Sequence, residues 1–529
     1  MSVELQQYIF EKKPKRRELL QYTAQSQHQG YRVQVFRNHS FELIEHTIGA
    51  YLDFSRLSIS FSYSNYDDSF SFLDLDSSAD LVVVWIDGAR YPNLSVQEFL
   101  ADRIGALRSM TDQPVLVLPF RGEAELQIPD VLVVNLSQLC QEMAADMVDE
   151  RTLAATGTAL SSKALLHISR ELGLRYLPAL LRPALKGLVV DFDNTLYQGV
   201  LGEDGIQGVT LTEGHKALQQ ELKRLAGQGF FLCAASKNEL EDVCRLLDSR
   251  EDFPLKREDF TKLCVSWQPK AQSMTEIAHY LNIHPDSLVF IDDNIGELTA
   301  VQMQHPNIWL LHAKEDACLT VEVLKSYPGL LKLRSSADDA KRSADVRSNE
   351  ARAQLRQTMS QEDYIKSLEL QLTYSLNDPQ RITRVAELAN KTNQFIFNYQ
   401  RYSEAQVSQL MSSEETAVLT LSLSDRLSDS GLVGVFVGHR MGNHMELEEC
   451  FVSCRALGRG IDEIMVSGAI SILLKHFGVE QLHVQFQTGP RNKPAGDFVE
   501  KYLSAYCGEP SEFSYVLPED LLTITISDI

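Results

Sequence analysis

Two aspartates at the end of a short apolar run are the residues of this chain best placed to do chemistry. The run Gly187–Val190 leads into Asp191-Phe-Asp193-Asn-Thr195, which sets two carboxylates at positions i and i+2. If the run is a buried strand, both emerge at its carboxyl end, where open α/β sheets place their ligands. Oxygen donors at this spacing suit Mg²⁺, which prefers carboxylates, waters and phosphate oxygens. The pattern predicts metal-assisted phosphoryl transfer with a carboxylate nucleophile.

Three further polar clusters follow in order along the chain. Ser236-Lys237-Asn238 comes directly after the apolar run Phe230–Ala235, and Asp292-Asp293-Asn294 comes directly after Leu288–Ile291. Lys270 begins a helical stretch in Trp267-Gln-Pro-Lys270. Since three of the four clusters follow strand-like runs, all four are expected to meet at one edge of a parallel sheet.

In their order and spacing, these clusters resemble the haloacid dehalogenase (HAD) phosphatase superfamily. The resemblance implies that Asp191 is the nucleophile that accepts a phosphoryl group and that Asp193 is the general acid and base. It implies that Ser236 hydrogen-bonds the phosphoryl oxygens and that Lys270 neutralises charge that develops in the transition state. The Mg²⁺ ligands it implies are Asp191, Asp193, Asp292 and Asp293.

A narrower resemblance comes from the longer motifs. Asp191–Gly205, Ser236–Glu239, Trp267–Lys270 and Asp292–Ile295 are similar to the FkbH-like proteins of HAD subfamily IIIC. Those proteins commonly carry a Trp-Gly type pair where this chain has Tyr197-Gln198, so the two differ on the substrate-facing side of that loop. The spacing between the first two motifs leaves no room for a substantial cap domain, so we expect an open site that faces a large partner.

A second candidate site surrounds Arg455-x-x-Gly458-x-Gly460, which stands between a strand-like run and a helix. Backbone amides at the start of a helix form an anion site, suited to a pyrophosphate or a phosphopantetheine phosphate. The motif is similar to the acyl-CoA loop of GNAT acyltransferases, and FkbH-like proteins carry such a domain. The phosphate- or pantetheine-binding residues that these resemblances imply are Lys237, Arg455, Gly458 and Gly460.

Cys454 has two interpretations that the sequence leaves open. Beside Arg455 and the next helix, it could supply a nucleophilic thiolate for catalysis. Equally, it could be a small buried hydrophobe like Cys450, four residues earlier. Asn393 and Gln394 are similarly ambiguous, because they could hydrogen-bond an acyl substrate or cap the end of a helix.

The alternation of strand-like runs and helical stretches predicts an α/β protein with three domains. We expect a flavodoxin/SGNH-like α/β domain over residues 1–183 and a HAD-like Rossmannoid domain without a large cap over residues 184–333. A GNAT-like α+β domain is expected over residues 367–529. Residues 334–366 are polar and lack an apolar stripe, which predicts an exposed helical connector.

The N-terminal domain offers one weak candidate for chemistry. Ser40 follows the strand-like run Arg32–Phe36 and could be a hydrolase nucleophile, with Asp87 nearby after the run Ala79–Ile86. Alternatively, Ser40 could cap a helix that begins at Phe41. No glycine-rich nucleophile turn surrounds Ser40, so the role of this domain stays open.

Composition limits the partners. The 529 residues carry a net charge of 50 − 72 = −22, which opposes binding to nucleic acid or to an anionic membrane. No apolar run approaches the roughly 20 residues that span a bilayer, and the N-terminus lacks a signal-peptide pattern. Eight cysteines without a CxxC pair fit reduced thiols. A cytoplasmic protein that binds neither nucleic acid nor membrane is expected.

The FkbH-like resemblance covers about residues 30–510 and implies a bifunctional enzyme. It would be a Mg²⁺-dependent HAD-type phosphatase or phosphotransferase coupled to an acyltransferase. The glyceryl group of 1,3-bisphosphoglycerate, a phosphorylated small molecule, would be dephosphorylated and loaded as a thioester onto the phosphopantetheine arm of an acyl carrier protein. Two alternatives stay open. One is acyl transfer to a sugar or other precursor in surface-polysaccharide or secondary-metabolite biosynthesis, and the other is a non-enzymatic docking scaffold.

Overall fold

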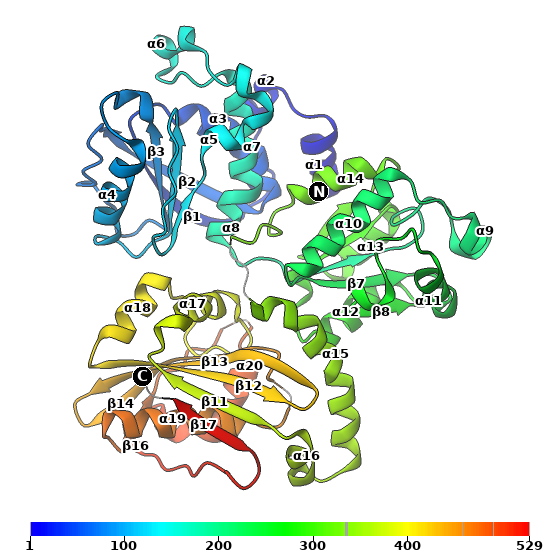
Figure 1. The fold of residues 1–529 in the computed structure, drawn as a ribbon, viewed down its shortest axis with the longest axis vertical. Coiled ribbons are helices and arrows are strands. Elements are labelled where there is room, and N and C mark those ends of the chain that lie inside the picture. Colours follow the sequence, from blue (N-terminus) through cyan, green and yellow to red (C-terminus); the bar gives the residue numbers. More distant parts are fainter. Residues whose placement is uncertain (1, 334–336, 458, 490, 528–529) are drawn as a thin grey trace. The chain divides into compact units, whose positions relative to one another are not determined.

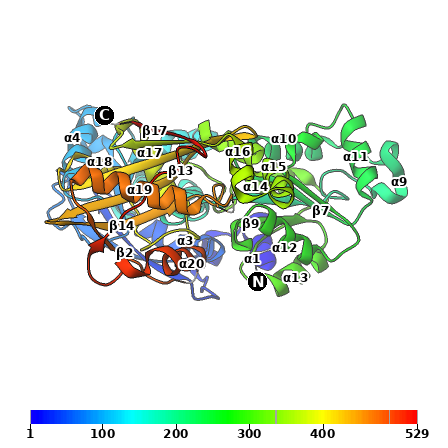
Figure 2. The same cartoon turned by 90° about the horizontal axis from the view of Figure 1, so that it is seen from below.

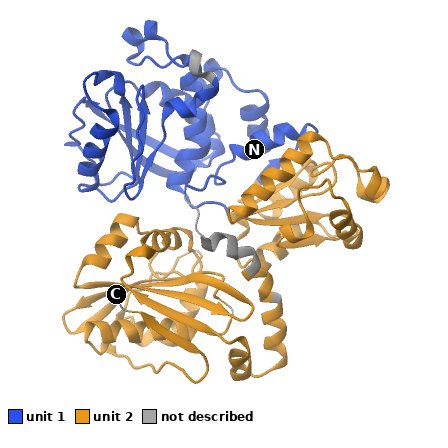
Figure 3. Cartoon of the chain, in the orientation of Figure 1, with its two compact units in different colours: residues 1–185, 310–333 blue, residues 186–309, 334–529 orange. Residues whose placement is uncertain are grey.

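Three β-sheets organise the chain, one in each predicted domain range (Figure 1). The computed structural model describes residues 2–333, 337–457, 459–489 and 491–527. The chain divides into two compact units, residues 1–185 with 310–333 and residues 186–309 with 334–529 (Figure 3). The predicted mixed α/β class is confirmed, while the domain boundaries remain predictions. Among the described residues, no helix is long and apolar enough to cross a membrane.

The first sheet is parallel throughout and has the order β2-β1-β3-β4-β5. Its strands are β1 Gln29–Arg37, β2 Leu57–Tyr66, β3 Leu81–Asp87, β4 Val115–Phe120 and β5 Val131–Val133. The helices of this region are α1 Ser2–Gln6, α2 Arg16–Leu20, α3 Glu42–Phe54, α4 Val96–Arg108, α5 Leu136–Leu139, α6 Leu153–Thr156, α7 Ser162–Glu171 and α8 Leu177–Leu181. Apolar residues of α3 and α7 cover one face of the sheet and those of α4 cover the other. Every residue of β3 is therefore buried, as a central parallel strand requires.

The second sheet is also parallel, with the order β10-β9-β6-β7-β8. Its strands are β6 Gly187–Val190, β7 Phe231–Ser236, β8 Lys262–Val265, β9 Leu288–Asp292 and β10 Trp309–His312. Its helices are α9 Leu201–Gly208, α10 Glu213–Gly227, α11 Leu240–Ser249, α12 Lys270–Tyr280, α13 Ile295–Gln304 and α14 Ala317–Lys325. The strands β6, β7 and β9 are buried along their whole length. Their carboxyl ends consequently meet at one edge of the sheet.

Only a small insertion follows the first of these strands. The segment between Thr195 and Ser236, described throughout, holds α9 and α10 and no further helix. A backbone bridge between Gln198 and Thr210 closes the base of the α9 segment. This segment is too short to form a cap domain, so the carboxyl edge of the sheet is left open on that side.

The third sheet is mixed and has the order β16-β15-β14-β13-β12-β11-β17. Its strands are β11 Gln371–Leu376, β12 Thr416–Asp425, β13 Ser428–Met441, β14 His444–Val452, β15 Gln481–Val484, β16 Ser511–Glu512 and β17 Thr523–Ser527. The helices are α15 Ala337–Thr358, α16 Gln361–Leu368, α17 Ile382–Lys391, α18 Glu404–Ser412, α19 Asp462–Phe477 and α20 Lys493–Phe498. Apolar residues of α16 and α19 pack on one face, and those of α17 and α18 pack on the other (Figure 2). The arrangement is a three-layer α/β/α domain.

The parallel strand β15 pairs along its whole length with the first half of β14, from His444 to Leu447. Beyond that point a loop runs between them. The backbone N–H of Val452 donates to the carbonyl of Phe395 at 3.0 Å, and that of Gln487 donates to Phe397 at 3.0 Å. The buried carboxylate of Glu449 accepts backbone N–H groups from the same loop, including that of Phe397 at 2.7 Å. The loop is thereby fixed to both strands.

Candidate functional site

Three carboxylates meet at the carboxyl edge of the second sheet. The β6–β9 register pairs Val190 with Ile291, so the residues that follow, Asp191 and Asp292, stand side by side. One oxygen each of Asp191, Asp292 and Asp293 lies within 4.8 Å of the others. Asn294 then ends the strand and caps α13, its side chain accepting the Gly296 N–H at 2.8 Å. The structure therefore brings together three of the four aspartates that the sequence proposed as metal ligands.

Lys270 bridges two of these carboxylates. As the first residue of α12, it places its Nζ 2.9 Å from Asp191 Oδ2 and 2.6 Å from Asp292 Oδ2. Burial opposes the charge of Lys270, but the two aspartates outweigh it and raise its pKa. Burial likewise raises the pKa of Asp191, and burial with Asp191 close by raises the pKa of Asp292 to about 7. Three carboxylates and one ammonium leave a formal charge of −3 + 1 = −2, which a divalent cation would balance.

The donor set fits Mg²⁺. Asp191 Oδ1 is buried and has no hydrogen-bond partner among the described residues, although buried carboxylate oxygens ordinarily have one. An oxygen left free in this way is available to a cation or to a phosphorus atom. Asp191, Asp292 and Asp293 would hold the ion, with water and substrate phosphate oxygens completing its shell.

The Asp193 side chain lies outside this carboxylate group. Its Oδ1 accepts the Tyr197 hydroxyl at 2.7 Å and the Leu201 N–H at 2.9 Å, and its Oδ2 accepts Asn238 Nδ2 at 2.9 Å. Three donors therefore hold Asp193 between the carboxylates and the α9 segment. Tyr197 is fully buried and supplies one of these donors. This position suits a general acid on the leaving-group side of the site.

Ser236 and Lys237 come from the end of β7 and have different surroundings. Ser236 is buried and accepts Asn238 Nδ2 at 3.2 Å. Lys237 is partly exposed, and its Nζ lies 2.6 Å from Glu297 Oε1. Asn238 was in the predicted motif without a role, and it is the residue that links Ser236 to Asp193.

The proton affinity of this site predicts a pH-dependent response to metal. Because its folded-state pKa of about 7 exceeds the unfolded value of about 4, Asp292 contributes stability that is lost as the pH rises toward 7. Above this pH, bound Mg²⁺ would balance the charge of the Asp292 carboxylate and restore the lost stability. At lower pH, Mg²⁺ must first displace the proton from the Asp292 carboxyl. We expect Mg²⁺ to raise the Tm more at about pH 8 than at about pH 6. Thermal unfolding at both pH values checks this, and equal shifts would contradict it. In Asp292→Asn the difference should vanish.

The Arg455 loop connects β14 to α19. Arg455 is buried, with Nε 3.4 Å from Ser453 Oγ and a second nitrogen 3.4 Å from the Leu432 carbonyl. Cys454 is half-buried, and its carbonyl accepts Asn282 Nδ2 at 3.0 Å. Cys450, in contrast, is fully buried in the core. The two cysteines therefore differ, and Cys454 is the one that a reagent can reach.

Of the two predicted glycines of this loop, Gly460 is the one that the structure describes. Gly460 has a φ of +75°, a left-handed conformation that favours glycine. Its carbonyl accepts Gln361 Nε2 at 3.3 Å, which ties the loop to α16. Gly458 lies outside the described residues.

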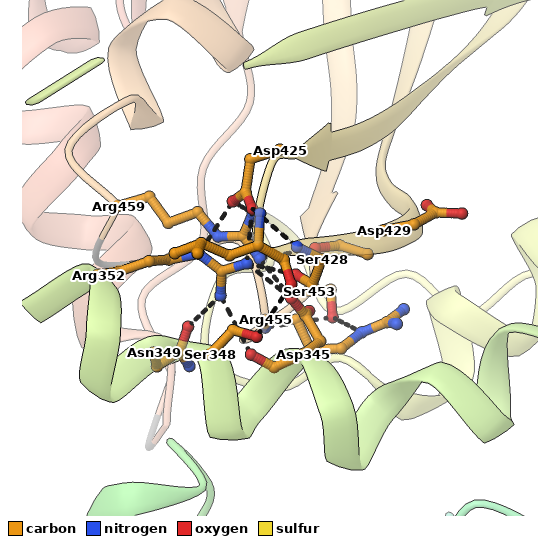
Figure 4. Close-up of polar contacts among 12 residues, drawn as sticks. Asp345, Ser348, Asn349, Arg352, Asp425, Ser428, Asp429, Ser453, Arg455 and Arg459 are labelled. Atoms are coloured by element: carbon orange, nitrogen blue, oxygen red, sulfur yellow. Dashed lines mark hydrogen bonds and ion pairs between the residues drawn. The ribbon is translucent and has the colours of Figure 1, made fainter. Parts of the chain in front are cut away.

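A buried ion-pair network holds the same loop against α15 (Figure 4). Arg459 lies 2.8 Å from Asp345 and 2.9 Å from Asp425. Arg352 contacts the same two aspartates, at 3.2 Å and 2.9 Å. All four side chains are nearly inaccessible to solvent. The connector helix therefore buries charged residues against the loop, where the sequence predicted an exposed surface, and the network was not predicted.

Asn393 and Gln394 belong to the loop that fills the gap between β14 and β15. Ile396 bridges Phe451 in antiparallel register, and continuing that register brings Asn393 and Gln394 toward Ser453 and Cys454. The Asn393 Oδ1 atom accepts a hydrogen bond from Arg401. The substrate-binding role of both residues remains a prediction.

Ser40 follows β1, and the carboxylate that its hydroxyl contacts is a poor base. Its hydroxyl donates to Glu42 at 2.7 Å, and the residue at the N-cap of α3 is Phe41, so Ser40 does not cap the helix. Burial works against the charge of Glu42, but hydrogen bonds from Arg37 and Ser40 prevail and lower its pKa to about 2. A carboxylate this acidic does not accept a proton at neutral pH. Asp87 is engaged by Arg121, with the Nε at 2.8 Å.

The chain resembles solved structures that contain a phosphatase domain or an acetyltransferase. No family model and no curated protein matches it. The N-terminal part of protein BF1531 from Bacteroides fragilis, containing a phosphatase domain complexed with Mg, is 20% identical with a TM-score of 0.47, covering 59% of this chain and 97% of that one. HAD family enzyme BT-2542 from Bacteroides thetaiotaomicron, complexed with magnesium and inorganic phosphate, is 14% identical with a TM-score of 0.19, covering 25% and 95%.

A third solved structure similar to part of the chain is an acetyltransferase. A ribosomal-protein-alanine N-acetyltransferase from Brucella melitensis biovar Abortus 2308 is 14% identical with a TM-score of 0.20, covering 27% of this chain and 97% of that one. Because all three TM-scores lie below 0.5, function has to be inferred from the side chains of this chain.

Proposed function

We propose that this protein is a Mg²⁺-dependent phosphatase or phosphotransferase coupled to acyl transfer. The observation that carries the phosphoryl part is the buried Asp191, whose Oδ2 contacts Lys270 while its Oδ1 has no hydrogen-bond partner among the described residues. Lys270 holds the carboxylate in place and leaves one oxygen aimed at substrate. A bound Mg²⁺ would neutralise the phosphate oxygens and so admit a carboxylate nucleophile to an anionic phosphoryl group.

The residues divide the phosphoryl chemistry among them. Asp191 Oδ1 forms a bond to phosphorus while the bond to the leaving oxygen breaks, and Asp193 gives that oxygen a proton. Ser236 and Lys270 contact the phosphoryl oxygens, where negative charge accumulates. Water then cleaves the aspartyl phosphate, with Asp193 taking back a proton, which releases inorganic phosphate and restores Asp191.

The acyl part of the proposal concerns Cys454. Its thiolate would attack the acyl carbon of 1,3-bisphosphoglycerate, expelling phosphate and forming a thioester. The thiol of a pantetheine arm on an acyl carrier protein would next displace Cys454 and take over the acyl group. The HAD-like site would remove the remaining phosphate ester. The half-exposed position of Cys454 and its closeness to Arg455 support this assignment over Cys450.

A second candidate is acyl transfer to an amine or hydroxyl of a small-molecule precursor. One observation favours it. The His439 imidazole on β13 contacts the Glu448 carboxylate on β14, and the Tyr402 hydroxyl donates to the same carboxylate at 3.0 Å. A carboxylate-oriented imidazole is a suitable general base for such an acceptor. A docking scaffold without activity is less well supported, because it gains nothing from three crowded carboxylates, two of which are buried.

Mass spectrometry tests the acyl proposal. Purified protein incubated with 1,3-bisphosphoglycerate and Mg²⁺ should gain the mass of a glyceryl or phosphoglyceryl group. Cys454→Ala should gain none, because the variant has no sulfur at this position to form a thioester. Cys507→Ala is the matched control, since Cys507 is an exposed cysteine of the same domain. Absence of the adduct on the unaltered protein would contradict glyceryl loading through Cys454. Full acyl transfer by Cys454→Ala would favour direct transfer to a small-molecule acceptor.

A further inference from the structure

Three large apolar side chains are exposed beside the carboxylate site. Leu240, Trp267 and Ile295 are 48%, 69% and 49% exposed. Each lies within four residues of a site residue, namely Ser236, Lys270 and Asp292 respectively. Exposed apolar side chains that gather beside polar residues mark sites where a ligand or partner binds. We call Leu240, Trp267 and Ile295 the apolar rim.

The fold positions the rim around the opening of the site. Leu240 and Ile295 are the first residues of α11 and α13, and Trp267 lies between β8 and α12. All three therefore stand at the carboxyl edge of the second sheet, the edge that carries Asp191. Because the α9 segment is the one insertion between β6 and β7, no cap domain from that segment covers them.

Two hydrogen bonds fix the loops that carry the rim. The indole nitrogen of Trp267 donates to Glu239 Oε1 at 2.7 Å, which links the loop after β8 to the loop after β7. Lys237 Nζ donates to Glu297 Oε1 at 2.6 Å, which links the loop after β7 to the start of α13. The Trp267 ring is consequently held in place with its faces in solvent, a preformed surface that loses little entropy on binding.

The direction of the reaction identifies what meets the rim. In an in-line displacement, the leaving group departs on the side of phosphorus opposite the nucleophile. Asp191 is buried at the base of the site, so the leaving group points outward, toward the opening. We infer that the leaving group of the physiological substrate carries apolar surface and packs against Leu240, Trp267 and Ile295. This inference rests on the proposed phosphoryl transfer at Asp191.

The rim acts on specificity through binding. Its residues touch the part of the substrate that does not react, so they lower KM for substrates with apolar leaving groups and leave the chemical step unchanged. A free phosphoglyceryl group is too polar to use such a surface. The same group carried on a pantetheine arm extends through the opening with methyl and methylene carbons. The rim therefore favours removal of phosphate from the arm-bound group.

Kinetics with two phosphate esters test the rim. For Trp267→Ala with Mg²⁺, we expect KM for 4-nitrophenyl phosphate to rise about fivefold, with kcat changed less than about twofold and KM for glycerol 3-phosphate unchanged. Trp267→Phe should retain most of the aryl preference. Met303→Ala is the matched control, because Met303 is 82% exposed on α13 and belongs to neither site nor rim. An equal change for both esters, or no change for either, would overturn the inference.

Binding of non-hydrolysable analogues separates the rim from catalysis. Calorimetry should show that Trp267→Ala weakens phenylphosphonate binding about fivefold and leaves methylphosphonate binding unchanged. If the unaltered protein binds both phosphonates but hydrolyses no ester, the phosphatase proposal fails while the rim is still tested. If it binds phenylphosphonate no more tightly than methylphosphonate, the rim has no part in recognition and the inference is wrong.

Discussion

Asp191→Asn will lower phosphatase activity at least about a thousandfold. The amide that replaces the carboxylate cannot act as the nucleophile, and it removes one of the charges that would hold Mg²⁺. Among the described carboxylate oxygens of this site, Asp191 Oδ1 is the one that is buried and has no hydrogen-bond partner. We therefore expect no neighbouring carboxylate to replace it as the nucleophile. Phosphate release from 4-nitrophenyl phosphate with Mg²⁺, compared for the two proteins, measures the loss.

The same substitution carries an internal control for folding. Removing one charge from a site with a formal charge of −2 relieves repulsion among the buried carboxylates. The metal-free Asp191→Asn protein should therefore be at least as stable as the unaltered protein, and its Tm should respond less to Mg²⁺. A stable variant that keeps more than a few per cent of the activity would show that Asp191 is not the nucleophile.

The elements that carry the carboxylate site were largely predictable because they are buried parallel strands. Such strands read as continuous apolar runs, and the expected runs Phe230–Ala235 and Leu288–Ile291 agree with β7 and β9 to within one residue at each end. The polar residues that follow each run then fall at the same sheet edge. What the runs could not show is how the side chains pair, such as the contact between Asp193 and Tyr197.

The strands that sequence reasoning missed lie at sheet edges or pair over long distances. β2 is an edge strand in which exposed serines alternate with partly buried residues, so it has no apolar run. β8 is an edge strand of four residues, of which one is fully buried. β17 pairs with β11, which precedes it by about 150 residues in the chain. In each case tertiary pairing, rather than local pattern, creates the strand.

The connector helix was misjudged for a related reason. Its composition has no apolar stripe, so burial was not expected. The structure buries Asp345 and Arg352 because their charge partners, Asp425 and Arg459, come from a hairpin and a loop far along the chain. Complementary charges of this kind leave no periodic signal in one segment, and the shape of the Cys454 loop was not predictable for the same reason.

Arg352→Ala will destabilise the third-sheet domain by about 3–5 kcal/mol. Arg352 and Arg459 together balance Asp345 and Asp425, and all four side chains are nearly inaccessible to solvent. Removing one arginine leaves a carboxylate without compensation in a region where water cannot replace the lost contacts. Urea unfolding of the full chain, followed by far-UV circular dichroism, measures the change in the free energy of unfolding.

A surface pair supplies the matched comparison for this prediction. Lys493 and Asp497 form an ion pair in the same domain at 2.7 Å, with side chains 82% and 61% exposed. Lys493→Ala should cost under about 1 kcal/mol, because water solvates the remaining carboxylate. Equal costs for the two variants would refute a structural role for the buried network. The double variant Arg352→Met, Asp345→Leu should recover part of the loss, since it removes one charge of each sign.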